Sequence, residues 1–162
     1  LMSTVQTKSQ LFLSLSDLLR HPSMRPLVRF GSRMHVFLYR LTGGKAQMAQ
    51  YPTMLLTVRG RKTGKLYTTP LIYVRDGDRY VIAAAYSGSD RDPIWWLNLQ
   101  AHPEAELQVM NQRLKVRAAL VLPTERQRLW QSLSAMYPYF TDYEARTTRE
   151  IPIVALTPVA ET

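Results

Sequence analysis

The segment Arg59-Gly60-Arg61-Lys62-Thr63-Gly64-Lys65 lies between two runs that are typical of β-strands. The first is Thr53-Met54-Leu55-Leu56-Thr57-Val58, and the second is Tyr67-Thr68-Thr69-Pro70-Leu71-Ile72-Tyr73-Val74. The segment is therefore predicted to be a loop joining two strands. Glycines let a backbone turn so that its N–H groups form a concave site for an anion, while arginine and lysine add charge. We interpret the loop as a candidate grip for a phosphate or polycarboxylate tail. The alternative is a solvated hairpin turn that happens to be basic.

The strand pattern continues on both sides of this loop. It predicts strands over residues 53–58, 66–75, 79–85, 105–110, 113–121 and 153–156. Asp76-Gly77-Asp78 and Asn111-Gln112 are the expected turns of two hairpins. Pro70 predicts a sheet edge, a bulge or a bend within the second strand, because proline has no N–H group to donate.

The N-terminal part predicts two amphipathic helices, over residues 8–20 and 32–41. Pro22 and Pro26 are expected to end the first helix. The first helix carries an apolar face made of Leu11, Leu15, Leu18 and Leu19. The second carries one made of Met34, Phe37, Leu38 and Leu41. The first helix is interpreted as packing on the domain surface, and a helix lying on a membrane surface, helped by nearby arginines, is the alternative.

Two more helices are predicted over residues 94–99 and 123–136, with Asp92 as the N-cap of the earlier one. Strands outnumber helices and do not alternate with them, so the pattern favours an α+β fold built on an antiparallel barrel. We divide the chain into an N-terminal helix with a basic lead-in, residues 1–31, and a barrel domain, residues 32–162.

The charge of the chain is unevenly distributed. The formal net charge is +9, and residues 1–65 contain eleven Lys and Arg but one acidic residue, Asp17. Residues 66–162 contain ten Lys and Arg and eleven acidic residues. The N-terminal excess attracts anions, such as a charged cofactor, an acidic lipid surface or nucleic acid.

Several kinds of catalytic site lack their signatures in this sequence. The chain has no cysteine, and its histidines do not recur at a metal-binding spacing. No Gly-x-Ser-x-Gly elbow, Walker loop or Rossmann fingerprint occurs. An enzyme of this composition is therefore expected to use a bound organic cofactor for the difficult step.

Aromatic residues gather at two places after the strands. Trp95 and Trp96 are adjacent in a predicted helix and point about 100° apart, so we expect one in the core and the other beside a flat ligand. The segment Tyr137-Pro138-Tyr139-Phe140-Thr141-Asp142-Tyr143 is interpreted either as a plug at one end of a barrel or as an aromatic lid over a planar ring.

Taken together, these features resemble the deazaflavin-dependent nitroreductase family over residues 32–158. The resemblance rests on an ordered set of short motifs rather than on any one of them. These are Leu38 to Gly44, Leu55-Leu56-Thr57, Gly60 to Gly64, Thr69-Pro70-Leu71, Arg75 to Arg79, Pro93 to Leu99, Met136-Tyr137-Pro138, Asp142-Tyr143 and Arg149 to Val154.

The resemblance implies an antiparallel split β-barrel, akin to the FMN-binding flavin reductases, with peripheral helices. It also implies binding of the reduced deazaflavin coenzyme F420, which carries a phosphate and an oligoglutamate tail. The expected activity is hydride transfer to an electron-poor acceptor, namely a quinone, an enone or a nitroaromatic compound.

The resemblance also assigns roles to individual residues. The cofactor-binding residues that it implies are Arg61, Lys62, Thr63, Gly64, Thr69, Pro70, Ala85, Tyr86 and Trp95. It places Tyr137, Phe140 and Tyr143 on the substrate side, and we expect Tyr137 or Tyr143 to donate a hydrogen bond or a proton in catalysis. Related proteins can carry Ser and Lys at the positions of Ala85 and Tyr86, tyrosine at Phe140 and a basic residue at Tyr67.

Other assignments stay open at the level of sequence. The same barrel with FMN or haem is one, and a basic module that docks on anionic lipid without catalysis is another. The basic region lacks interleaved aromatic residues, which argues against binding of single-stranded nucleic acid. We expect a cytoplasmic protein, with peripheral attachment at the inner face of the cell membrane and homodimer formation left open.

Overall fold

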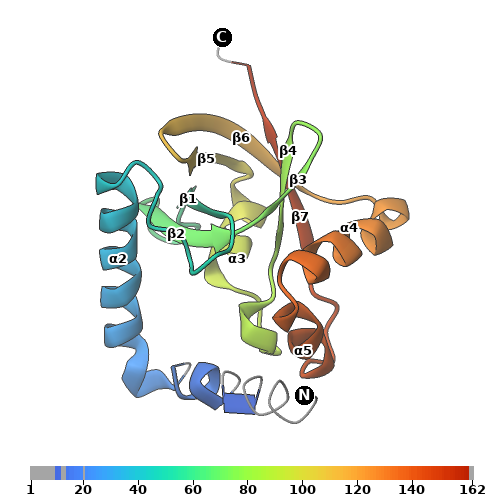
Figure 1. Ribbon diagram of the computed structural model, residues 1–162. Helices are drawn as coiled ribbons and strands as arrows, with labels where there is room; N and C mark the ends of the chain where they lie inside the picture. The colour runs from blue at the N-terminus through green and yellow to red at the C-terminus, as the bar shows by residue number, and fades with distance from the viewer. Residues whose placement is uncertain (1–9, 12–13, 20, 161–162) are drawn as a thin grey trace. The chain divides into compact units, whose positions relative to one another are not determined.

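The computed structural model describes residues 10–11, 14–19 and 21–160 and groups the chain into two compact units, Leu1–Met34 and His35–Thr162 (Figure 1). The predicted division at residue 31 stays a prediction.

The described part of the first unit is mostly helical, with a bend at His21. Residues 10–11 and 14–19 are helical, a short 3-10 helix η1 covers Pro22–Met24, and helix α2 covers Arg25–Leu41. The rest of the helix predicted over residues 8–20 lies outside the described residues. The expectation that α2 starts at Ser32 was wrong, since it begins at Arg25. Pro26 lies in its first turn, where proline is tolerated because an N–H group there has no partner within the helix.

The buried side of α2 also differs from the prediction. Val36 and Tyr39 are buried against Leu55, whereas Met34, Phe37, Leu38 and Leu41 are exposed. Hydrogen bonds of the Tyr39 side chain explain why this face of α2 is buried. The Tyr39 hydroxyl donates to the Thr53 carbonyl at 2.8 Å and accepts from the Met110 N–H at 2.9 Å. A buried tyrosine needs such partners, so this hydroxyl determines which side of α2 packs.

The second unit is built on one antiparallel seven-stranded sheet in the order β2-β1-β5-β6-β7-β4-β3. Its strands are β1 (Thr53–Arg59), β2 (Leu66–Ile72), β3 (Val74–Asp76), β4 (Arg79–Ala83), β5 (Glu104–Val109), β6 (Gln112–Leu120) and β7 (Ile153–Pro158).

The sheet curls because of one short connection. Only Tyr73 separates β2 from β3, yet these strands lie at opposite ends of the strand order. A single residue spans about 3.5 Å, so the two edges of the sheet must come together. The strand predicted over 66–75 breaks at Tyr73, whose N–H donates to the Pro52 carbonyl at 3.2 Å. The predicted antiparallel split barrel is confirmed. Pro70 lies on the edge strand β2, which agrees with the sheet edge that was one of the three predictions for this proline.

Alternate residues of β1 divide the core between the two faces of the sheet. Met54, Leu56 and Val58 belong to the main core, while Leu55 points the other way and meets α2. Helix α3, Ile94–Ala101, contributes both tryptophans to the main core, with Trp95 8% and Trp96 5% exposed. The expectation that only one is core was wrong, because α3 is apolar nearly all round and is covered on several sides.

Helix α4, Pro123–Met136, lies beside β3, β4 and β7, whereas α5, Tyr139–Ala145, lies beside α4 and the segment Tyr86–Gly88 (Figure 1). Helix α4 matches the prediction, and α5 forms where a loop or helix end was expected. Asp92 does not act as the N-cap of α3. That position is Pro93, and the Asp92 carboxylate forms an ion pair with Arg149 instead.

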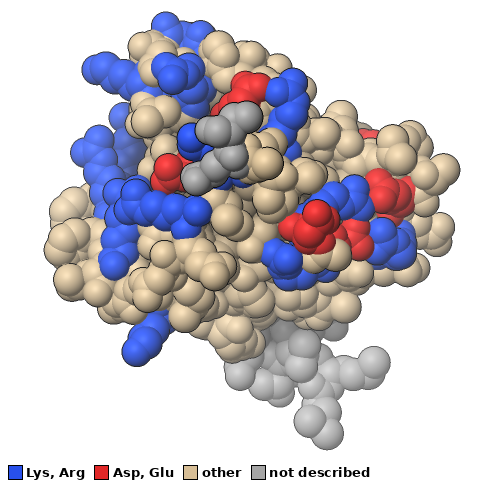
Figure 2. Space-filling view, turned by 90° about the horizontal axis from the view of Figure 1, so that it is seen from above, with Lys and Arg blue, Asp and Glu red and all other residues tan. Residues whose placement is uncertain are grey.

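An ionic cluster of Asp76, Arg79, Glu125 and Arg128 links the β3–β4 turn to α4. Asp76 accepts from Arg79 and from Arg128, and Glu125 accepts from Arg79 at 2.8 Å. On the face shown in Figure 2, acidic side chains lie next to cationic ones, and Lys and Arg are the more numerous charges on one side of the view. Hydrogen bonds from Arg128 and Arg79 lower the pKa of Asp76 from 3.8 to about 2.

We expect the ionic cluster to make stability depend on acid pH. Because the pKa of Asp76 is lower in the folded state, its contribution is complete above about pH 4 and is lost as the pH falls through 2. Thermal unfolding of wild type and Asp76→Asn between pH 7 and pH 2 measures this. The melting temperature of Asp76→Asn should be lower at pH 7, and the gap should close toward pH 2. An equal gap at both pH values would contradict it.

Candidate functional site

The basic loop, Arg59–Lys65, joins β1 to β2 in a tight hairpin. The Gly60 N–H donates to the Lys65 carbonyl and the Gly64 N–H donates to the Gly60 carbonyl, each at 2.8 Å. A Cβ at Gly60 would lie 2.6 Å from the Tyr67 ring and 2.9 Å from the Thr63 hydroxyl, so any larger residue here would force these side chains to move. Gly64 adopts a φ of 68°, which favours glycine. The predicted residues Arg61, Lys62, Thr63 and Gly64 are all exposed on this loop.

A buried amide fixes the loop to α3. The Asn98 side chain is 3% exposed, and its Oδ1 accepts from the backbone N–H of Arg61 at 3.2 Å and from its guanidinium at 3.1 Å. One of five guanidinium donors is thereby engaged, which leaves Arg61 with others for a ligand. Sequence reasoning did not identify Asn98. The only signal was a polar residue within an apolar helix.

Strand β2 runs from the basic loop to a second group of residues. Thr69 and Pro70 lie in the middle of β2, opposite Leu56 and Leu55 of β1. The far end of β2, at Ile72, pairs with Thr53, close to Tyr51. At about 3.3 Å per residue, β2 spans about 20 Å. One edge of β2 pairs with β1, and the other edge pairs with no strand in the described sheet.

The second group is an aromatic cluster, made of Tyr51, Tyr137, Tyr139, Phe140 and Tyr143. The Tyr137 ring lies at its centre, with ring centroids 4.8 Å from Tyr51, 5.2 Å from Tyr139, 5.0 Å from Phe140 and 6.2 Å from Tyr143. Tyr51 was not predicted, because it precedes β1 and is distant in sequence from the others.

Two hydroxyls meet within the aromatic cluster. The hydroxyl oxygens of Tyr137 and Tyr143 are 3.3 Å apart. Burial raises the pKa of both phenols, and the hydrogen bond between them raises that of Tyr137 further. Both groups are therefore protonated at neutral pH and can donate hydrogen bonds.

The connection between β4 and α3 contains a left-handed turn, Tyr86–Gly88. Tyr86, Ser87 and Gly88 have φ values of 46°, 53° and 74°. Two successive non-glycine residues in this region are uncommon and indicate strain that the surroundings maintain. Ala85 is 3% exposed, whereas Tyr86 is 48% exposed. The turn packs on α5, where a Cβ at Gly88 would lie 2.7 Å from the Tyr143 carbonyl oxygen.

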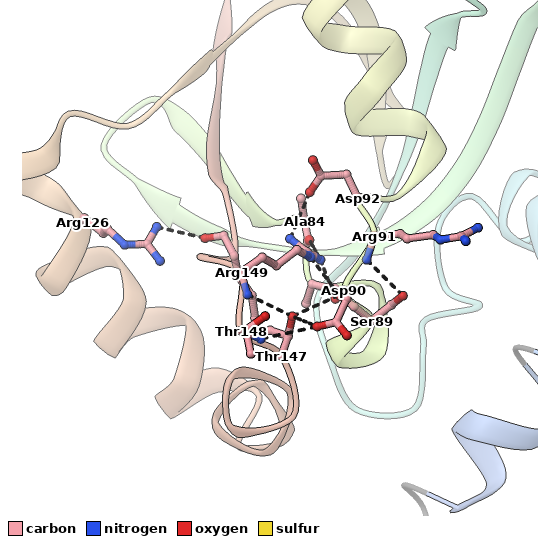
Figure 3. Close-up of polar contacts among 11 residues, drawn as sticks. Ala84, Ser89, Asp90, Arg91, Asp92, Arg126, Thr147, Thr148 and Arg149 are labelled. Carbon is pink, nitrogen blue, oxygen red and sulfur yellow. Dashed lines mark hydrogen bonds and ion pairs between the residues drawn. The ribbon is translucent and has the colours of Figure 1, made fainter.

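Arg149 holds the same connection from the other side (Figure 3). Its guanidinium donates to the carbonyls of Ala84, Ala85 and Ser89 at 2.9, 3.1 and 2.8 Å and to the Asp92 carboxylate at 3.0 Å. The side chain is 16% exposed. Arg149 appeared in the sequence only as part of a motif, without a role.

The predicted residues thus fall into two groups that β2 connects. The basic loop, Thr69, Pro70 and the helix of Trp95 make one group, and Ala85 and Tyr86 with the aromatic cluster make the other. Trp95 itself is buried in the main core. No cluster of three or more His, Cys, Asp or Glu that could hold a metal ion occurs in the described part of the chain.

Known proteins resemble this chain in sequence and structure. The family described as F420H(2)-dependent quinone reductase matches residues 31–158. The F420H(2)-dependent quinone reductase Rv1261c of Mycobacterium tuberculosis is 40% identical over 131 residues, covering 77% of this chain and 88% of that protein.

Two solved structures have the same fold. An F420-H2 dependent reductase, FDR-A, superposes with a TM-score of 0.61 at 29% identity and covers 65% of this chain and 93% of its own. A structure described as a domain-swapped dimer gives a TM-score of 0.63 at 26% identity and covers 82% of this chain and 98% of its own.

Proposed function

Because the chain belongs to the F420H(2)-dependent quinone reductase family, we propose that reduced coenzyme F420 lies along β2, between the basic loop and the aromatic cluster. The chain is an oxidoreductase, its cofactor is coenzyme F420, and its acceptor is a quinone-type small molecule. An enone or a nitroaromatic compound as acceptor remains part of the proposal.

The position of β2 supports this arrangement most directly. Its edge runs about 20 Å, from exposed cations at one end toward the aromatic cluster at the other, and an elongated cofactor with an anionic tail and a flat ring needs both. The glycine at position 60 lets the loop close tightly, and the cations of Arg61 and Lys62 remain exposed. The residues present therefore fit the coenzyme.

Individual residues take the following roles in the proposal. Arg61, Lys62, Thr63 and Gly64 hold the phosphate region, and Thr69 and Pro70 line the path along β2. Ala85 and Tyr86 border the ring, with Trp95 supporting that border from the core. When bound, the reduced coenzyme supplies the hydride.

The tyrosines supply the chain's own chemistry. Phe140 shapes the acceptor side. In the protonated pair of Tyr137 and Tyr143 one hydroxyl donates to the other, and the second hydroxyl donates a hydrogen bond to an acceptor oxygen as negative charge develops on it. Because these hydroxyls are already oriented by one another, little reorganisation is needed when the acceptor arrives.

A titration of the full chain with reduced F420, followed by tryptophan fluorescence, tests the proposal. We expect saturable quenching and then oxidation of the coenzyme on addition of a quinone such as menadione. Enone and nitroaromatic acceptors form further arms of the same screen. A protein that purifies yellow or red and ignores F420 would instead favour FMN or haem.

We also propose that α2 rests on an anionic membrane surface. Its exposed apolar residues recur every three or four positions and form an apolar stripe, made of Leu27, Phe30, Met34, Phe37, Leu38 and Leu41. Arg25, Arg29, Arg33 and Arg40 lie on the same helix, which has no acidic residue. An apolar stripe with flanking cations is typical of helices that lie on anionic lipid. None of the helices in the described residues is long and apolar enough to cross a membrane.

Liposome sedimentation at physiological salt tests this placement. We expect the chain to sediment with vesicles containing anionic phospholipid and not with neutral ones, and Phe30→Ala with Phe37→Ala to reduce binding about tenfold. Leu120→Ala with Leu122→Ala, at exposed positions elsewhere, is the matched control. Equal loss in both variants would contradict the proposal. We propose a cytoplasmic location with peripheral attachment to the membrane. Nucleic acid is not a proposed partner, and a homodimer is proposed only by analogy with the domain-swapped neighbour.

A further inference from the structure

Arg149 makes an unusually complete set of contacts for a residue outside the proposed site. Its guanidinium donates to acceptors at both ends of the connection between β4 and α3, at Ala84 and Ala85 on one side and at Ser89 and Asp92 on the other. The chain between these ends is the left-handed turn. One planar group therefore holds the two ends of the turn at a fixed separation (Figure 3).

The neighbours of Arg149 reinforce this hold. The Thr147 hydroxyl donates to the Asp90 carboxylate at 2.7 Å, and the Arg149 N–H donates to the Thr147 hydroxyl at 3.3 Å. Only arginine has five donors in a rigid fork, so lysine cannot satisfy these carbonyls together. The carbonyls lie beyond the end of β4 at Ala83, where sheet pairing no longer provides partners for them.

The turn needs such support because its backbone is strained. Tyr86 and Ser87 have positive φ values, a region that residues other than glycine rarely adopt. A strained conformation of this kind persists only where the surroundings over-determine it. Arg149 restrains the turn from one side and α5 from the other, where Gly88 packs against the backbone of Tyr143.

The left-handed turn also lies against Tyr143. Gly88 packs against the Tyr143 backbone. Burial raises the pKa of the Tyr143 phenol while the Ser87 side chain lowers it, and the Tyr143 hydroxyl lies 3.3 Å from that of Tyr137. We propose that Arg149 is a positioning residue: by holding the left-handed turn against α5, it fixes the Tyr143 hydroxyl and the exposed Tyr86 ring. This inference rests on the proposed function where it connects the turn to acceptor reduction.

The test compares Arg149→Ala and Arg149→Lys with Arg126→Ala. Arg126 is the matched control, because it donates to the Ile151 carbonyl at 2.9 Å and pairs with Glu150, and among the described residues it makes no hydrogen bond or ion pair with the turn. Amide hydrogen exchange is measured on coenzyme-free protein, and kcat and KM are measured with reduced F420 and menadione. Added guanidinium ion at millimolar concentration tests rescue of Arg149→Ala.

Both Arg149 variants are expected to speed exchange of residues 85–92 at least about tenfold, with little change in the strands. Their kcat should fall at least about tenfold, KM for coenzyme should change less than about threefold, and guanidinium should restore part of the activity of Arg149→Ala. Arg126→Ala should show none of these effects. If Arg149→Ala does not fold, the hydrogen-exchange pattern of Arg149→Lys decides whether Arg149 holds the left-handed turn.

Unchanged exchange in residues 85–92 in both Arg149 variants would overturn the inference, and so would uniformly faster exchange across the chain. A kcat loss matched by Arg126→Ala would also overturn it. The proposed function is tested separately, by coenzyme binding to wild type. If wild type does not bind the coenzyme, the proposed function is wrong. Hydrogen exchange in the coenzyme-free protein would still decide whether Arg149 holds the turn.

Discussion

Replacement of both Arg61 and Lys62 by alanine is expected to weaken binding of reduced F420 by about ten- to a hundredfold. Hydrogen bonds to charged groups contribute about 1.5–3 kcal/mol each when shielded from water, and less at an exposed loop. Two such contacts, reduced for their exposure, amount to about 1.4–2.8 kcal/mol, which corresponds to that range of affinity. The barrel should remain folded, because both side chains are exposed.

Fluorescence quenching at several salt concentrations measures the effect. Wild-type affinity should fall as salt rises, and the variant should depend on salt less steeply because it has lost two cations that attract the anionic tail. Lys115→Ala with Arg117→Ala removes the same charge from exposed positions of β6 and is the matched control. Equal weakening by both double variants would show that only net charge matters, and it would contradict a specific role for the basic loop.

Local sequence signals predicted much of this fold. Gly64 and the Asp76-Gly77-Asp78 turn mark hairpins, because turns with positive φ depend on glycine within a few residues. The antiparallel pairings of β1 with β2 and of β3 with β4 follow from those turns. The family blocks then identified the split barrel, which periodicity alone could not distinguish from other antiparallel barrels.

The predictions that were wrong or incomplete concern residues whose position depends on a partner distant in the sequence. Asp92 has the sequence context of an N-cap, yet Arg149, more than fifty residues later, takes its carboxylate. Helix α2 has more apolar residues than one face can bury, and the hydroxyl of Tyr39 selected the face through Thr53 and Met110. Tyr51 and Asn98 reach the candidate site only through tertiary contacts, so no local pattern indicated them.

These distant contacts share a physical cause. The polar ones join groups far apart in sequence: Arg61 donates to the buried Asn98 oxygen, and the Arg149 fork donates to three carbonyls of the connection between β4 and α3. Hydrophobic periodicity reports which residues are buried on average, but it does not report which polar atoms meet. The candidate site therefore had to be assembled from the structure, although several of its residues were named beforehand.

Tyr143→Phe is expected to lower kcat for quinone reduction by about a hundredfold while coenzyme affinity stays within about threefold of wild type. A positioned hydrogen-bond donor at developing negative charge contributes about 10²–10³ in rate, and the Tyr143 hydroxyl is the more buried of the pair. Tyr137→Phe should act in the same direction. Because the two hydroxyls bond to each other, the double variant should lose less than the product of the single losses.

The pH profile gives an independent readout of the same pair. The pKa of each phenol is raised above its ordinary value of 10, so both stay protonated and neither should produce a loss of kcat up to pH 10. Tyr139→Phe is the matched control, since its ring lies 5.2 Å from that of Tyr137 in the same cluster. The prediction is checked by measuring kcat and KM for the acceptor between pH 6 and pH 10 in Tyr143→Phe, Tyr137→Phe, the double variant and Tyr139→Phe. A loss in Tyr139→Phe equal to that in Tyr143→Phe would mean that packing of the aromatic cluster, rather than the hydroxyl pair, supports the reaction.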